Sequence, residues 1–382
     1  MATDNKNKVL NVPHLRFPEF SGEWERKRLK DVCNIRTGNK NTQDKSDNGI
    51  YPFYVRSQIV ERINSWTFDG EAILTAGDGV GVGKVFYYST GKIGVHQRVY
   101  ILSDFKCDGK YLYSYFAGNF YNRVKRMSAK NSVDSVRMEM IADMPIALPS
   151  IEEQKKIGHL LALLDDRIAT QNKIIEDLKI LKSAIIEKHY RCVKKHRVRV
   201  EELGKPFSVG NLSKDDLSEI GVPCIIYGEL FTTYGAIINK VESHTKKIDG
   251  MTLSRKGDLL FPSSTTVDAV SLIAPSAINV DGVILGGDMF GIHVNSNFDA
   301  QYLSYFFNHI AKNQFAKYAK GSTIIHLHHT DIDKAKLLLP CLEEQNRMAM
   351  CMVSLDEKIT IESAILKTML IQKSYLLRQM FI

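Results

Sequence analysis

The chain has 382 residues, of which 44% are hydrophobic and 25% are charged. These proportions are typical of a folded globular protein and exclude a disordered, fibrous or disulfide-stapled one. Lys and Arg (51) outnumber Asp and Glu (43), and the net charge of +8 favours a polyanionic partner, with nucleic acid first among the candidates.

The six cysteines lie far apart without any CxxC pair, which argues against a zinc site or a disulfide framework and fits a reducing compartment. The first ten residues lack the apolar core of a signal peptide, and no apolar run approaches the ~20 residues that cross a bilayer. We therefore expect a cytoplasmic protein with no membrane function.

Short runs rich in β-branched and aromatic residues, separated by Gly and Asp turns, predict strands in both halves of the chain. In the first half they are residues 50–55, 72–75, 82–88 and 95–102, and in the second half 223–227, 258–261 and 291–294. We expect two mixed α/β domains made mostly of strand.

Two long helical segments follow these domains, and each begins with the same motif. Pro149 to Gln154 reads Pro-Ser-Ile-Glu-Glu-Gln, and Pro340 to Gln345 reads Pro-Cys-Leu-Glu-Glu-Gln. In the first copy, Ser150 is the expected N-cap, with Glu153 completing a capping box. The recurrence indicates that the chain is a tandem duplication.

Both helical segments carry apolar residues at alternating steps of four and three, the spacing of a heptad seam. Two polar residues interrupt each seam, and they recur at equivalent positions. The expected seam consists of Leu164, Ile168, Gln171, Ile175, Leu178, Lys182 and Ile185 on the first helix, and of Ile359, Glu362, Leu366, Met369, Lys373 and Leu376 on the second.

The polar interruptions predict that the two helices pack antiparallel. A parallel pairing in register would place Lys182 against Lys373, which is costly because two ammonium groups would share an interface. An antiparallel register that pairs Lys182 with Glu362 and Gln171 with Lys373 removes this conflict. It also pairs Ile185 with Ile359 and Leu178 with Leu366.

Three motifs resemble catalytic or metal sites, but their details disagree with those functions. The glycine-rich run 77–84 has Asp78 where a phosphate-binding loop needs Gly and Val85 where it needs Ser or Thr. Glu153-Gln154-Lys155 has the spacing of a nuclease E-x-K motif, but its second copy, Glu344-Gln345-Asn346, lacks the lysine. The cluster around His326 and His328 has no Cys partner that would suggest a metal site.

The chain resembles a specificity subunit of a type I restriction-modification system. The resemblance rests on the opening stretch from Val12 to Trp24, on the turn Ala76 to Gly81, and on both helix-start motifs. It implies an α+β fold in which two mixed α/β target recognition domains are separated by two long helices in an antiparallel coiled coil, a tandem duplication with pseudo-twofold symmetry. The expected domains are a first target recognition domain (1–149), a central spacer helix (150–190), a basic linker (191–199), a second target recognition domain (200–340) and a C-terminal spacer helix (341–382).

The resemblance also implies a non-catalytic protein that binds double-stranded DNA, each domain reading one half of a bipartite site. Two modification (methyltransferase) subunits would bring S-adenosylmethionine and methylate adenine, and restriction subunits would use ATP and Mg²⁺, so this chain itself would bind no cofactor. A spacer of about 30 helical residues spans roughly 45 Å, enough to place two domains one ~34 Å DNA turn apart.

The DNA-binding candidates are forked or basic side chains in loops, together with glycines that let a backbone approach. They are Arg56, Gln58, Gly79, Gly81, Lys84, Gln97, Arg98, Lys125, Arg126, Lys130 and Ser132 in the first half, and Lys320, Ser322, His326 and His328 in the second. Two alternative functions remain open: a DNA-binding enzyme with its own nuclease activity, and a coiled-coil scaffold that binds only protein.

Overall fold

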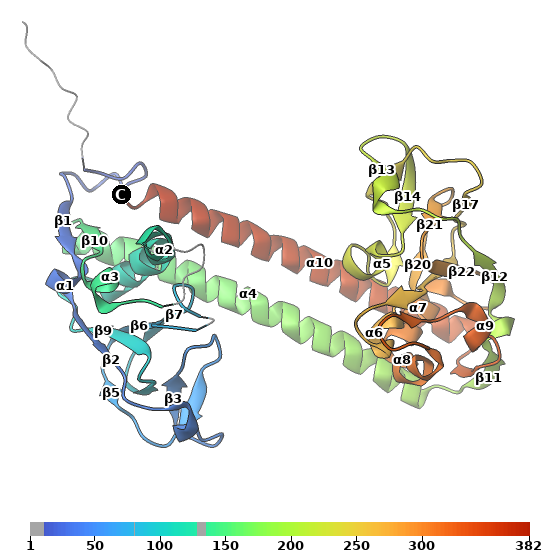
Figure 1. Ribbon diagram of the computed structural model, residues 1–382, viewed down its shortest axis with the longest axis horizontal. Coiled ribbons are helices and arrows are strands. Elements are labelled where there is room, and N and C mark those ends of the chain that lie inside the picture. The colour runs from blue at the N-terminus through green and yellow to red at the C-terminus, as the bar shows by residue number, and fades with distance from the viewer. Residues whose placement is uncertain (1–10, 80, 128–134) are drawn as a thin grey trace, which may run out of the picture. The chain divides into compact units, whose positions relative to one another are not determined.

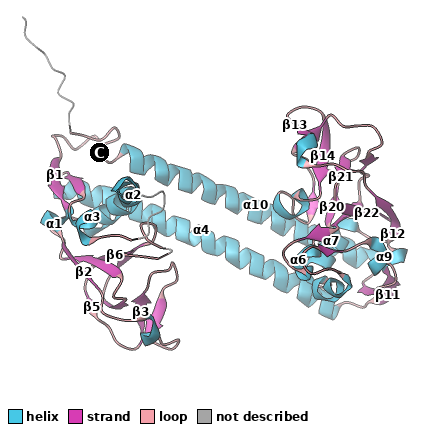
Figure 2. Ribbon diagram, in the orientation of Figure 1, coloured by secondary structure: helices cyan, strands magenta, loops and turns pink. Residues whose placement is uncertain are grey.

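The structure, a computed structural model, describes residues 11–79, 81–127 and 135–382. It divides into two compact units, one made of Met1–Asn172 with Ala364–Ile382 and the other of Lys173–Ser363. The named strands lie in two parts of the chain, which we call the first head (residues 25–148) and the second head (residues 196–339) (Figure 2). The long helices α4 (Ile151–Cys192) and α10 (Leu342–Gln379) each contribute one part to each unit.

The first head contains two four-stranded sheets and a two-stranded pair (Figure 1). One sheet has the order β2-β9-β6-β7, the other the order β4-β3-β8-β5, and β1 pairs with β10. The elements are β1 (Glu25–Arg28), α1 (Leu29–Val32), β2 (Asn34–Thr37), β3 (Tyr51–Tyr54), β4 (Glu61–Ile63), β5 (Phe68–Asp69), β6 (Ala72–Ala76), β7 (Phe86–Ser89), β8 (Lys92–Val95), β9 (Val99–Ser103), α2 (Gly109–Met127), α3 (Met138–Ala142) and β10 (Pro145–Leu148).

The second head repeats this plan with two five-stranded sheets, ordered β12-β22-β18-β20-β15 and β13-β16-β14-β21-β17, and with the pairs β11-β24 and β19-β23. The elements are β11 (His196–Arg199), β12 (Gly204–Ser208), β13 (Leu217–Ser218), β14 (Val222–Ile226), α5 (Glu229–Thr232), β15 (Ile237–Ile238), β16 (Ser243–Thr245), β17 (Thr252–Leu253), β18 (Asp258–Pro262), β19 (Ser264–Thr265), α6 (Ala269–Leu272), β20 (Ser276–Ile278), β21 (Ile284–Gly286), β22 (Met289–Val294), α7 (Ala300–His309), α8 (Lys312–Phe315), β23 (Ile325–His326), α9 (His329–Ile332) and β24 (Lys336–Leu339).

Two strands predicted from the sequence are shorter than expected. The run 95–102 is interrupted at residues 96–98, between β8 and β9, and the run 82–88 forms a strand only from Phe86. The expected basic linker 191–199 also differs, because His196–Arg199 forms β11, which pairs with β24 and buries Val198. Apolar content alone did not reveal the turn at 96–98.

Aromatic side chains on α2 and α7 form the centre of each head. On α2, Tyr111, Phe116 and Phe120 recur at helical spacing and are buried against the sheet. On α7, Tyr302 and Phe307 occupy the positions equivalent to Tyr111 and Phe116. These aromatic residues are therefore core residues.

The N-cap expected at Ser150 is present, but the capping box is not completed as predicted. Ser150 Oγ accepts a hydrogen bond from the Glu153 backbone N–H at 3.3 Å. The Glu153 side chain, 1% exposed, instead receives two hydrogen bonds of 2.8 Å from Nε and Nη2 of Arg16. A forked guanidinium satisfies both carboxylate oxygens, so it takes precedence over the cap.

The glutamine of each helix-start motif joins the helix to its head. Gln154 donates from Nε2 to the carbonyl of Pro149 (2.8 Å), and its Oε1 accepts the backbone N–H of Asp108 (3.0 Å). Gln345 makes the same two bonds, to the Pro340 carbonyl (2.9 Å) and from the Asp299 N–H (3.0 Å). Both side chains are buried, so each amide replaces water for two backbone groups.

The long helices run antiparallel within each unit, as the sequence predicts. In the second unit, Lys182 of α4 contacts Asp356 of α10 at 2.5 Å, and His189, further along α4, contacts Glu344, which precedes Asp356 on α10. In the first unit, Lys373 of α10 pairs with Asp165 of α4. All residues of the predicted seam are buried or half-buried.

The predicted register between the helices is wrong. Lys182 pairs with Asp356, nearly two turns before Glu362, and Glu362 contacts Lys358 of its own helix at 2.5 Å. Lys373 likewise pairs with Asp165 rather than with Gln171. Because apolar residues recur every three or four positions, several registers bury them almost equally well, and aspartates outside the predicted seam decide between them.

The glutamine bridge predicts a specific loss of stability. Gln345→Leu removes both hydrogen bonds while keeping a side chain of similar volume, and each buried backbone group left unpaired costs about 1–3 kcal/mol. We expect a lower free energy of unfolding in chemical denaturation. Gln372→Leu, at an exposed position of the same helix, is the control and should change stability little; equal effects of the two substitutions would contradict the role given to Gln345.

The helix register predicts which charge reversal rescues another. Lys182→Glu places a carboxylate against Asp356 and should lower the free energy of unfolding by about 1.5–3 kcal/mol, the range for charged hydrogen bonds. Adding Asp356→Lys should restore most of the loss, whereas adding Glu362→Lys should not. Thermal denaturation of the two double variants tests this prediction, and rescue by Glu362→Lys alone would support the register that we reject.

Candidate nucleic-acid interface

Three residues of the first head, two of them predicted to bind DNA, meet at one carboxylate. Asp78, directly after β6 and Gly77, accepts a hydrogen bond from Nη1 of Arg56 at 3.1 Å and from Nη1 of Arg98 at 2.8 Å. The side chains of Arg56 and Arg98 are 47% and 61% exposed. Gln97, in the same turn as Arg98, is also exposed. The carboxylate thus orients two exposed guanidinium groups, each of which has further donors.

A buried histidine, His96, holds the backbone of the turn that carries Arg98. His96 is 4% exposed, its Nδ1 accepts the Arg98 backbone N–H at 3.0 Å, and its Nε2 lies 3.3 Å from Thr42 Oγ1. Burial, with the nearby Arg56 charge, lowers the pKa of His96 below its ordinary value. Burial therefore favours the neutral imidazole, and its hydrogen bond fixes the backbone that carries Arg98.

The glycines of the run 77–84 are required by its backbone. Gly79 has a φ of +78°, a left-handed conformation that side chains disfavour. A Cβ at Gly81 would lie 2.3 Å from the Arg56 carbonyl oxygen. Gly79 and Gly81 therefore occupy positions that a residue with a side chain would not fit, next to Asp78 and Arg56.

The remaining predicted residues of the first head that the structure describes are exposed. Gln58 lies between β3 and β4, and the Lys84 ammonium lies 5.6 Å from the ring centroid of Tyr121 on α2. Lys125 and Arg126 occupy the last turn of α2, where cations also suit the helix dipole. Lys130 and Ser132 lie outside the described residues.

In the second head, the predicted residues lie on and beside one hairpin. Lys320 and His326 exchange backbone hydrogen bonds of 2.9 and 2.7 Å, with Ser322 exposed between them. The Lys320 ammonium contacts Asp331 at 2.5 Å and lowers the pKa of that carboxyl. The rings of His326 and His328 are nearly parallel, 10° apart, with centroids separated by 6.3 Å.

The DNA-binding candidates chosen from the sequence did not include Asp78 of the first head, or Ser264 and Asp288 of the second head. In the second head, Ser264 Oγ donates to Asp288 Oδ2 at 2.6 Å, at the positions where the first head has Asp78 and Arg98. Only the strand pairing reveals this equivalence, because Asp78 follows β6, Ser264 begins β19, and Asp288 lies between β21 and β22.

The described residues contain no group of three or more His, Cys, Asp or Glu side chains placed to hold a metal ion. The Glu153 carboxylate would be the metal ligand of an E-x-K nuclease motif, but both of its oxygens accept hydrogen bonds from Arg16. In the part of the chain described by the structure, no helix is long and apolar enough to span a membrane.

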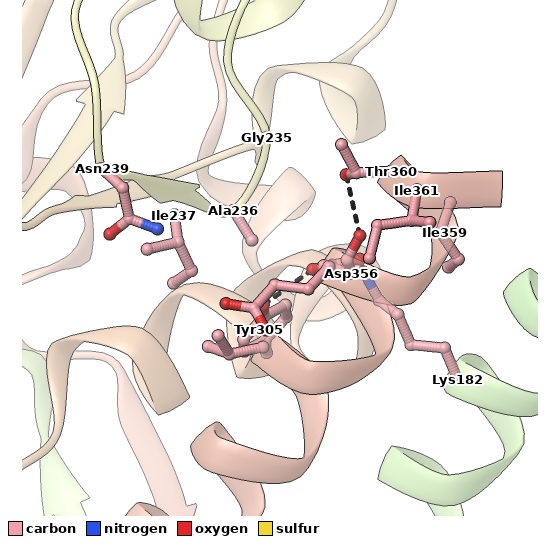
Figure 3. A pocket seen from close by; sticks show the side chains of 12 residues that line it. Lys182, Gly235, Ala236, Ile237, Asn239, Tyr305, Asp356, Ile359, Thr360 and Ile361 are labelled. Atoms are coloured by element: carbon pink, nitrogen blue, oxygen red, sulfur yellow. Dashed lines mark hydrogen bonds and ion pairs between the residues drawn. The ribbon is translucent and has the colours of Figure 1, made fainter. Parts of the chain in front are cut away.

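A cavity of about 580 Å³ lies in the second unit, where β15 and α7 face α10 (Figure 3). Asp356 receives hydrogen bonds there from Tyr305 Oη at 2.7 Å and from Lys182 at 2.5 Å. Burial and the Asp356 charge raise the pKa of Tyr305. Both carboxylate oxygens are engaged, so this polar cluster fixes the head to the helices.

Comparison with known proteins places the chain in a family. The sequence matches the type I restriction modification DNA specificity domain twice, over residues 21–179 and 213–369. Among curated proteins, the specificity subunit of the type I restriction enzyme EcoDI from Escherichia coli is 29% identical over 43% of this chain, a match that spans 37% of that subunit. The MjaVIII specificity subunit of Methanocaldococcus jannaschii is 23% identical over 91% of this chain and 89% of its own length.

The fold agrees with that assignment. The crystal structure of a type I restriction-modification S subunit from M. genitalium superposes with a TM-score of 0.70 at 14% identity, covering 97% of this chain and 99% of that one. A second solved structure, described as showing complex assembly and conformational transition of the type I system, gives a TM-score of 0.52 at 14% identity and covers 93% of this chain and 96% of that one. The chain therefore belongs to the type I restriction-modification DNA specificity family, and it carries two copies of the family's domain in tandem.

Proposed function

We propose that each head reads one half of a bipartite DNA sequence and that the chain directs modification or restriction by partner subunits. The observation that supports this most is that one backbone framework recurs in both heads with different side chains at its exposed turns. Arg98 and Asp78 in the first head are replaced by Asp288 and Ser264 in the second. Two heads that share a backbone but carry different exposed side chains are expected to bind different base sequences, because side chains read the base edges.

The proposed partners are double-stranded DNA, two modification subunits and restriction subunits acting in the cytoplasm. The chain contributes recognition, while S-adenosylmethionine, ATP and Mg²⁺ are used by those subunits. Exposed apolar residues on both long helices support a role in binding other proteins. They include Leu163, Ile174, Ile180, Leu181, Ile361, Leu370 and Ile371.

The two alternative functions have less support. A nuclease would need free acidic ligands, and Glu153, the candidate ligand, is held by Arg16. A scaffold that binds only protein would not need two heads whose turns carry arginine side chains in one head and histidine side chains in the other. We therefore retain DNA recognition as the function of both heads.

An exchange of one head tests whether the two heads act as independent modules. Replacing residues 200–340 with the corresponding segment of a related subunit should change one half of the methylated sequence and leave the other half unchanged, because each head has its own core. Methylome sequencing of cells that also produce the modification subunits measures the outcome. A change in both halves would contradict independent reading.

Basic residues at the end of α2 should contribute sequence-independent affinity. Lys125→Ala with Arg126→Ala should weaken binding of the assembled complex to all DNA sequences. The slope of log affinity against log salt should become shallower by about 0.9 for each phosphate that is no longer neutralised. Titrations at several salt concentrations measure the slope, and an unchanged slope would place these two residues away from the DNA backbone.

A further inference from the structure

The exposed turns of the two heads can be matched residue by residue through their backbone hydrogen bonds. Gly77 N–H donates to the Arg98 carbonyl at 2.8 Å, and Ser263 N–H donates to the Asp288 carbonyl at 2.7 Å. The neighbouring bridges, Lys40 with His96 and Gly210 with Gly286, match in the same register. Arg98 and Asp288 therefore occupy the same position in the two heads, and so do Asp78 and Ser264, the residues that follow Gly77 and Ser263.

The first head presents hydrogen-bond donors at this position. Two guanidinium groups, those of Arg56 and Arg98, share the single carboxylate of Asp78, and each contacts it through Nη1. Their other N–H groups are not used by this carboxylate. A guanidinium has five N–H donors and no acceptor. Among DNA bases, guanine presents two acceptors side by side in the major groove, N7 and O6, which a fork of this kind matches.

The second head presents an acceptor at the equivalent position. Asp288 is exposed, and its Oδ2 is held by the hydroxyl of Ser264, which is 5% exposed. The carboxylate lies at a cavity of about 680 Å³ that Lys214 and Tyr227 also line. An ionised carboxylate only accepts hydrogen bonds, and the amino groups at cytosine N4 and adenine N6 are the base-edge donors in the major groove.

We infer that the first head selects a guanine through Arg98 and Arg56, whereas the second head selects a base that carries an exocyclic amino group through Asp288. The inference rests on the proposed function, because it assigns a base chemistry to each reading surface. Ser264 and Asp78 are positioning residues: each fixes the direction of the group that contacts the base.

Single substitutions in the full chain, produced with its modification subunits, test this inference. In methylome sequencing, Arg98→Ala should reduce discrimination at one guanine position of one half-site by roughly ten- to hundredfold, as removal of one bidentate base contact implies. Asp288→Asn, which keeps an acceptor for Ser264, should relax one position in the other half-site. It should also strengthen binding to unrelated DNA, because it removes a negative charge from the surface.

Two matched variants serve as controls. Arg28 is an exposed arginine paired with Asp143 in the first unit, and Asp281 is an exposed aspartate of the second head that accepts the Lys256 N–H. Arg28→Ala and Asp281→Asn should leave both half-sites unchanged. The half-site that a test variant leaves intact shows that the protein has folded and assembled.

Several outcomes would overturn the inference. If Arg98→Ala and Asp288→Asn leave every position unchanged, or if either relaxes both halves together, these residues do not select bases as we infer. The proposed function fails separately, and recognisably, if the unsubstituted chain directs no sequence-specific methylation with its modification subunits.

Discussion

The buried glutamine at the start of each long helix is the contact on which the architecture depends. Gln154 and Gln345 each connect the carbonyl of a proline to a backbone N–H at the start of a helix in the head. A buried side-chain amide that pairs with two backbone groups holds the helix and the head in one position, because a shift of either one would leave a buried polar group without a hydrogen bond. The contact therefore fixes each head to its helix, and it explains why the glutamine of the motif recurs in the sequence.

The rest of each head separates into a constant framework and exposed turns that differ. The framework consists of the strand pairing that places residues 77–78 beside residue 98 and residues 263–264 beside residue 288. It makes few demands on exposed side chains, so a donor-rich turn and an acceptor turn can occupy the same backbone position. This independence lets one fold present two different hydrogen-bonding surfaces.

The features that depend on periodicity and repetition could be predicted from the sequence. The helix starts and the buried face of both helices follow from the duplicated motif and from apolar spacing, and the antiparallel direction follows from the polar interruptions of the seam. The register did not follow, because Asp356 and Asp165, which pair with the seam lysines, lie outside the seam. Arg56 and Arg98 were predicted from their chemistry, but Asp78, which joins them, was not, because the contact links three turns distant in the sequence.

Some features had no local signal at all. Asp288 lies between two strands, and aspartate is a common turn residue, so nothing in the sequence singles it out. Its equivalence to Arg98 is visible only in the hydrogen bonds of the sheet. The strand His196–Arg199 resembled a basic linker because only Val198 among its four residues is apolar and buried.

Whether two heads with one framework read two different sequences can be tested most directly by determining the DNA sequence that is modified. Long-read sequencing of DNA from cells that produce this chain and its modification subunits reports every methylated site. We expect a bipartite motif of two unlike half-sites separated by a fixed number of unread bases. A single continuous motif, or two identical half-sites, would contradict this division of recognition between the heads.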